Sequence, residues 1–185
     1  MIPMWNSIGV LPPIQPGVEG ISRDRSPYCV DLSAFVNRFC ISQERKNILI
    51  GLLNFRHDLH DLGITTGFQW LNGSFSENIE ITEQRPPMDI DVVTFFDLPS
   101  GENQQSLLTK APDLFQPARL KKKYLIDGYY IGLGRVVDER YVRNVSYWYS
   151  MWSHRRDNVW KGFVQVSLAP SGDSGANQLL NAWGM

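Results

Sequence analysis

Two β-strand patterns joined by a polar segment constrain the fold of this chain more than any other feature. The first pattern covers 67–72 and leads into Gly73-Ser74, and the second covers 89–96 and begins with Asp89 and Asp91. Alternate residues of a strand point to the same face, so the two carboxylates lie on one face, about 7 Å apart at a rise of ~3.3 Å per residue. The pattern predicts a sheet with a carboxylate pair at one end of a strand.

Residue types around this pair favour the binding of a metal ion and a phosphate chain. Neighbouring carboxylates repel one another unless a cation lies between them, and Mg²⁺ binds through carboxylates together with substrate phosphates. Gly73 allows the backbone to approach a phosphate, and Ser74 adds a hydroxyl and N–H donors. A helix beginning within 75–84 would direct its N-terminus at the same anion. We expect a metal–triphosphate site, with Lys161 as a further phosphate contact and with Arg85 either contacting a phosphate or lying on the surface.

The order Gly73-Ser74, then Asp89-Ile90-Asp91 on the next strand, resembles the motif of the nucleotidyltransferase superfamily that includes DNA polymerase beta and the kanamycin nucleotidyltransferases. That superfamily usually adds a third carboxylate on a later strand, and Asp127 is the candidate here. The whole chain, with its Pro-rich opening and its late Lys161-Gly162, also resembles an uncharacterised group of small bacterial minimal-nucleotidyltransferase-like proteins. The spacer between Ser74 and Asp89 is slightly longer than usual, a departure that concerns the loop rather than the metal site.

The resemblance implies an α+β nucleotidyltransferase fold, with a small mixed β-sheet and helices packed on it. It also implies transfer of a nucleotidyl group from an NTP to a hydroxyl of a protein or tRNA acceptor. Asp89 and Asp91 would hold Mg²⁺ or Mn²⁺, and Asp127 would complete the metal site and help deprotonate the acceptor. Gly73 and Ser74 would bind the β and γ phosphates. Small proteins of this kind often belong to toxin–antitoxin or defence modules, which implies a cognate partner protein.

The rest of the chain predicts one central domain with two flanking segments. Five prolines within residues 1–28 exclude a regular helix there and predict an extended arm, which packs on its own domain or on a neighbouring subunit in a homo-oligomer. The central domain covers 29–170, with helices over 31–39, 42–62 and 138–154, a short helix near 104–110 and a strand over 162–168. Residues 171–185 are expected to form a flexible tail.

Composition and charge limit the classes of function. A net charge of −1 argues against a protein that coats nucleic acid by charge alone. We expect a cytoplasmic protein, because no apolar run is long enough to span a membrane and no secretory leader pattern is present. Cys29 and Cys40 have no metal-site spacing and are expected to be reduced. The cationic run Arg119–Lys123 is expected on the surface, with binding of phosphates or a nucleic-acid acceptor as the alternative.

Two other classes of function fit the same residues. One is a nucleotide-binding or antitoxin-like partner protein with little turnover, which obligate complex formation would favour. The other is a metal-dependent nuclease or phosphohydrolase, because carboxylates with Mg²⁺ serve either chemistry. Release of diphosphate rather than cleavage of a polymer would distinguish the transferase from the hydrolase.

Overall fold

A five-stranded β-sheet forms the centre of the fold in the computed structural model, which describes residues 1–134 and 136–184. The strands, in sheet order, are β1 (Tyr28–Val30), β5 (Val164–Ser167), β2 (Gly67–Asn72), β3 (Ile90–Phe96) and β4 (Ile126–Gly132). β2 is antiparallel to both of its neighbours, whereas β3 and β4 run parallel, as do β1 and β5. This mixed sheet agrees with the predicted α+β class, and β2 and β3 confirm the two central strand predictions.

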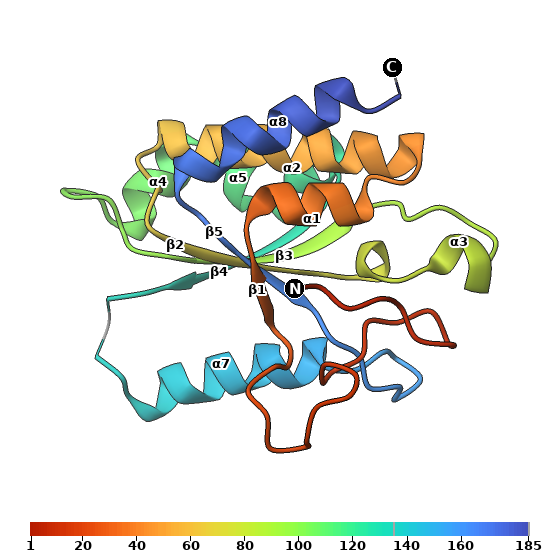
Figure 1. Cartoon of the computed structure of the whole chain (residues 1–185). Helices are drawn as coiled ribbons and strands as arrows, with labels where there is room; N and C mark the ends of the chain where they lie inside the picture. The colour runs from red at the N-terminus through yellow and green to blue at the C-terminus, as the bar shows by residue number, and fades with distance from the viewer. Residues whose placement is uncertain (135, 185) are drawn as a thin grey trace.

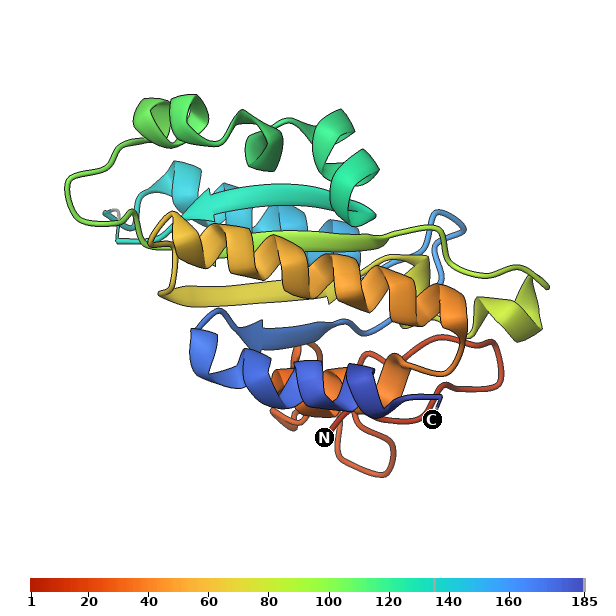
Figure 2. The ribbon, with the colours of Figure 1, turned by 90° about the horizontal axis from the view of Figure 1, so that it is seen from above.

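Helices cover both faces of the sheet (Figures 1 and 2). The described residues form the α-helices α1 (Leu32–Phe39), α2 (Gln43–Asp61), α3 (Ile79–Thr82), α4 (Gln104–Lys110), α5 (Pro112–Phe115), α6 (Pro117–Tyr124), α7 (Glu139–Trp152) and α8 (Asp173–Ala182). Two 3₁₀ turns, η1 (Ser74–Ser76) and η2 (Pro170–Gly172), complete the set. α1, α2, α8 and the α4–α6 segment lie over one face, and α7 and the first residues of the chain lie over the other. None of these helices combines the length and apolar character needed to cross a membrane.

Helix α2 confirms the helix predicted over 42–62. The Ser42 hydroxyl accepts a hydrogen bond from the Arg45 N–H at 3.3 Å, which satisfies one of the amides at the helix start. Gly63 follows the helix with φ of +80°, a conformation that glycine adopts without strain. The apolar side chains of α2 are fully or almost fully buried in the core between this helix and the sheet: Ile48, Leu49, Leu52, Phe55 and Leu59.

Helix α7 confirms the helix predicted over 138–154 and packs aromatic side chains against the opposite face of the sheet. Trp152 is buried in a second core cluster with Trp70 of β2, Phe95 of β3 and Phe163. Trp148 is partly buried, and its ring centroid lies 4.4 Å from that of Tyr129 on β4. These aromatic side chains hold α7 beside the strands that end at the candidate site.

The segment from 98 to 125 contains more helix than the single short helix that was predicted. α4 confirms that helix, but α5 and α6 follow it, and α6 carries the cationic run Arg119–Lys123. Leu120 and Tyr124 on the inner side of α6 are buried, and α6 packs against α2. Packing against the longer α2 stabilises α6, whose own sequence is too polar to predict a helix.

Where the sequence predicted a flexible tail over 171–185, the structure has helix α8. Ala176 and Leu180 are buried, and α8 packs against α1 and α2. The Asp173 carboxylate at its start pairs with the fully buried Arg56 of α2 at 2.6 Å. The spacing of Ala176, Leu180 and Trp183 is helical, but asparagines between these residues and glycines on either side of them weaken the pattern.

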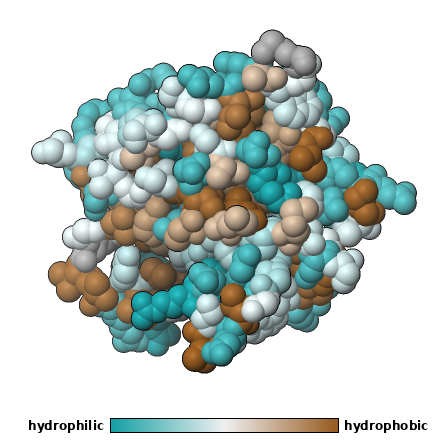
Figure 3. Space-filling view, in the orientation of Figure 1, coloured by the Kyte–Doolittle hydropathy of each residue, from teal (hydrophilic) through white to brown (hydrophobic). Residues whose placement is uncertain are grey.

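Residues 1–27 form an irregular arm with an isolated bridge between Ile14 and Arg25. Val10 and Leu11 of the arm are buried against the rest of the chain, so it packs on its own domain. Large exposed apolar side chains are scattered, and Figure 3 shows them as separate patches among polar residues on the face it draws.

Candidate functional site

Strand pairing brings the predicted carboxylates together. In the parallel β3–β4 pair, Asp91 lies directly opposite Asp127, and in the antiparallel β2–β3 pair it lies opposite Asn72. Neighbouring strands are about 4.8 Å apart, so opposed side chains on one face reach a common ion. Asp89 immediately precedes β3 and faces the same pocket.

An open pocket of about 660 Å³ lies around these carboxylates. All seven residues that the sequence singled out line it: Gly73, Ser74, Arg85, Asp89, Asp91, Asp127 and Lys161. Further lining residues come from β2, the loop after it, α6, β4, α7 and the hairpin after α7: Asn72, Glu77, Glu83, Lys121, Tyr129, Met151, Trp152, His154, Arg155, Arg156 and Asp157. The pocket therefore joins segments that are far apart in the sequence.

The turn after β2 depends on Gly73. Its φ is +80°, in the left-handed region, and a Cβ built on it would lie only 2.9 Å from Cγ of Asp91. Any larger residue would meet both backbone strain and the carboxylate. The main chain of the Gly-Ser turn therefore lies directly against one of the proposed metal ligands.

The segment after the Gly-Ser turn does not form one continuous helix over 75–84. It consists of η1, an extended Glu77 and the four-residue α3, so no long helix directs its N-terminus at the turn. The buried Arg45 of α2 donates to the carbonyl oxygens of Phe75 and Glu77, both at 2.6 Å, and pairs with Glu80 at 2.5 Å. A side chain thus satisfies the carbonyls that a continuous helix would have bonded.

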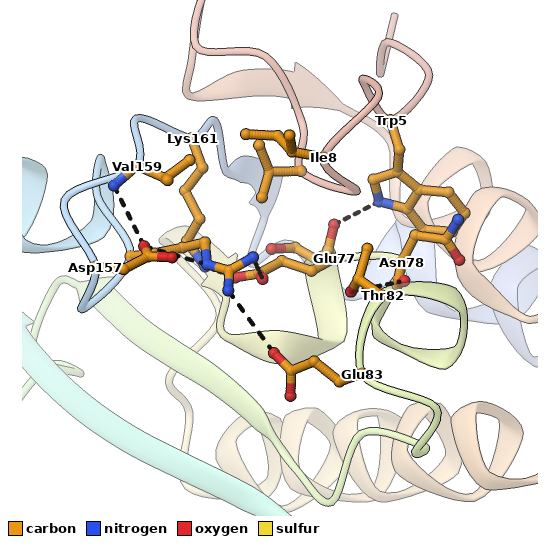
Figure 4. Close-up of polar contacts among 12 residues, drawn as sticks. Trp5, Ile8, Glu77, Asn78, Thr82, Glu83, Asp157, Val159 and Lys161 are labelled. Atoms are coloured by element: carbon orange, nitrogen blue, oxygen red, sulfur yellow. Dashed lines mark hydrogen bonds and ion pairs between the residues drawn. The ribbon is translucent and has the colours of Figure 1, made fainter.

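The N-terminal arm braces the same loop. The Trp5 indole donates to the carbonyl oxygen of Ser76 at 2.8 Å, and the backbone N–H of Asn78 donates to the carbonyl oxygen of Gly9 at 2.8 Å. Figure 4 shows Trp5 beside the loop that carries Glu77 and Asn78. The loop conformation next to the carboxylates is therefore fixed from both α2 and the arm.

The electrostatics of the carboxylate group fit a divalent cation. Burial, together with the charges of Asp127 and Asp89, raises the pKa of Asp91 from 3.8 to about 6. Lys121 pairs with Asp89 at 2.5 Å, and this hydrogen bond raises the pKa of Lys121. A cation between the carboxylates would relieve the same repulsion, and Mg²⁺ and Mn²⁺ take oxygen ligands of this kind.

The two cations predicted to bind phosphate differ in their surroundings. Lys161 is almost fully buried, and its ammonium group lies 2.5 Å from Oε1 of Glu77 and donates to the carbonyl oxygen of Gly73 at 3.2 Å. Figure 4 shows Lys161 and Glu77 pointing toward each other. Arg85 is exposed at the rim and pairs with Glu83 at 2.6 Å. Lys161 therefore contacts the backbone of the turn, whereas Arg85 faces solvent.

Sequence reasoning assigned no role to Glu77, Tyr129 or Arg155. Tyr129 follows Asp127 by two residues and so lies on the same strand face, which the sequence spacing indicates. Burial and the charge of Asp127 raise the pKa of Tyr129 to about 12. Nothing in the sequence distinguished Glu77 from the glutamates that follow it. Arg155 enters the pocket only because the hairpin after α7 folds back beside β2.

A second acidic cluster, His57, Asp58 and Asp61 on α2, lies outside this pocket. His57 is exposed, and Asp58 already accepts hydrogen bonds from Lys123 and Tyr124. These partners and the exposure are typical of a solvated helix face rather than of a metal centre.

In a comparison with protein-family models, the model described as "Family of unknown function (DUF6932)" matches residues 3–167. The match covers the arm from residue 3 onward, the strands β1 to β5 and every residue that lines the pocket. Comparisons with curated proteins and with solved structures gave no significant match.

Proposed function

We propose that this chain, which belongs to DUF6932, a family of unknown function, is a metal-dependent nucleotidyltransferase with the nucleotidyltransferase fold. The observation that carries the proposal is the convergence of Asp89, Asp91 and Asp127 on one pocket beside the Gly73-Ser74 turn. The reaction is in-line transfer of a nucleotidyl group from an NTP to a hydroxyl of a protein or RNA acceptor, with release of diphosphate.

The pocket residues have distinct roles in this reaction. Asp89 and Asp91 hold Mg²⁺ or Mn²⁺, and Asp127 completes the carboxylate set and accepts the proton of the acceptor hydroxyl. The bound ion offsets the negative charge of the phosphates. N–H groups of the turn at Gly73 and Ser74 bind the phosphates, because a glycine with positive φ presents its backbone there without a covering side chain.

The cellular setting follows from the resemblance to small bacterial nucleotidyltransferases alone. We propose a protein or tRNA acceptor and a cognate partner within a toxin–antitoxin or defence module. A homo-oligomer formed through the arm would have to use the exposed side of that segment, because Val10 and Leu11 are buried within the chain.

The test is transfer of label from α-labelled ATP, GTP, CTP and UTP to cell lysate and to total tRNA, with Mg²⁺ or Mn²⁺. The wild type is compared with Asp127→Asn and with Asp24→Asn, an exposed carboxylate outside the pocket. We expect a labelled protein or RNA band with the wild type and Asp24→Asn but not with Asp127→Asn. Metal-dependent NTP binding without transfer to any acceptor would instead identify a nucleotide-binding partner protein, and polymer cleavage would identify a nuclease.

A further inference from the structure

The buried Lys161 is occupied by contacts within the protein. Its side chain is 6% exposed, lies 2.5 Å from the Glu77 carboxylate and donates to the carbonyl oxygen of Gly73 at 3.2 Å. Leaving this position to reach a ligand would remove the nearest cation from a carboxylate that is 8% exposed, at a cost comparable to breaking a buried ion pair. Lys161 therefore holds the Gly73-Ser74 turn in place.

Arg155 is held differently in the same cluster. Its side chain is 25% exposed, and its guanidinium lies 3.4 Å from Asp157, 3.5 Å from Glu77 and 3.8 Å from Glu83. Within residues 1–134 and 136–184, none of these contacts has hydrogen-bond geometry. The guanidinium is thus attracted to the cluster by charge while its N–H donors remain available to a ligand.

The backbone around Arg155 is fixed. Its N–H donates to the carbonyl oxygen of Val159 at 2.8 Å, and the Lys161 N–H donates to that of Ser153 at 2.8 Å. These bonds close a hairpin directly after α7. Arg155 therefore projects into the pocket from a defined frame, so that only its side chain must reorient to meet a ligand (Figure 4 shows the neighbouring Glu83 and Asp157).

A chain of contacts leads from the carboxylates to Arg155. The Asp91 carboxylate lies against Gly73, the Gly73 carbonyl accepts from Lys161, and Lys161 pairs with Glu77. Glu77 in turn contacts Arg155. These contacts, and the pocket that both residues line, connect Arg155 to the carboxylates by way of the Gly73-Ser74 turn.

We infer that Arg155 binds the terminal phosphate of the nucleoside triphosphate, and that Lys161 is a positioning residue for the Gly73-Ser74 turn. The inference rests on the proposed nucleotidyltransferase function and adds the group that selects triphosphates over shorter nucleotides. A guanidinium suits this task because its planar donors match two phosphate oxygens at once. The terminal phosphate replaces the loose contacts with Glu77, Glu83 and Asp157.

The test is the affinity for AMP, ADP and an ATP analogue that cannot be cleaved between its α and β phosphates, each titrated with Mn²⁺. Arg155→Gln should weaken binding of the triphosphate by about 10- to 100-fold and leave AMP binding unchanged, because the lost contact is a charge-assisted one. Arg155→Lys should retain part of the preference. Arg143→Gln is the matched control, since Arg143 is exposed on α7, outside the pocket, and pairs only locally with Glu139.

The outcomes distinguish failure of the role assigned to Arg155 from failure of the proposed nucleotidyltransferase function. A preference for triphosphate over AMP that is unchanged in Arg155→Gln would overturn the role of Arg155 and leave the proposed function standing. Absence of any Mn²⁺-dependent nucleotide binding by the wild type would overturn both. Retained Mn²⁺ binding by Arg155→Gln, measured without nucleotide, shows that the carboxylate site of the variant is intact.

Discussion

Replacing Asp91 with asparagine should stabilise the metal-free protein. Burial and the neighbouring carboxylates raise the pKa of Asp91 to about 6 in the folded chain, against 3.8 as its ordinary value. The folded state therefore binds more protons than the unfolded state between these values, so stability that is present below pH 4 is lost as the pH rises through 6. Asparagine has the shape of aspartate and stays neutral at every pH.

The magnitude follows from the size of the shift. About two pKa units at ~1.4 kcal/mol each give an increase of about 3 kcal/mol in the free energy of unfolding for Asp91→Asn at pH 7.5. The increase should shrink to about 1 kcal/mol at pH 4.5, where the wild-type carboxyl is largely protonated in the folded state. Saturating Mg²⁺ or Mn²⁺ should remove the advantage, because the ion stabilises only the wild-type site.

The assay is urea denaturation of wild type and Asp91→Asn in EDTA at pH 7.5 and 4.5, repeated at pH 7.5 with the metal. Asp24→Asn, at an exposed position, is the matched control and should be neutral throughout. A variant that is less stable than the wild type in EDTA at both pH values would refute the reasoning, since it would mean that the carboxylate is not under repulsion in the fold.

Three further predictions concern residues that shape the site and its support. Gly73→Ala should lose metal–nucleotide binding and at least about 1 kcal/mol of stability, because Gly73 has a positive φ and lies close to the Asp91 carboxylate. A variant that binds metal–nucleotide with wild-type affinity in a titration would contradict this. Arg56→Leu should cost about 3–5 kcal/mol in urea denaturation, because it removes the closest partner of the Asp173 carboxylate; a loss below ~1 kcal/mol would show that the pair contributes little. Arg45→Met should cost about 2–4 kcal/mol and also weaken nucleotide binding, because Glu80 and the carbonyls of Phe75 and Glu77 lose their donor. Unchanged nucleotide affinity would show that the conformation of this loop does not affect binding.

The sequence by itself determined the elements whose signals are local. Capping at Ser42 and the apolar spacing that follows specify α2, and short, largely apolar runs specify β2 and β3. The spacing of Asp89 and Asp91 and the glycine at 73 predicted residues that line the pocket, because each of these signals is formed by residues close together in the sequence. These local signals do not depend on how the strands and helices pack against one another.

Only the tertiary structure decided which distant side chains complete the site. The buried Arg45 replaces a helix by bonding loop carbonyls, and helix α8 forms because α1 and α2 offer an apolar surface for it. Glu77 acquires significance only when the hairpin after α7 brings Lys161 and Arg155 against it. Contacts between segments about 80 residues apart depend on strand order and helix packing, and no local pattern in the sequence encodes them.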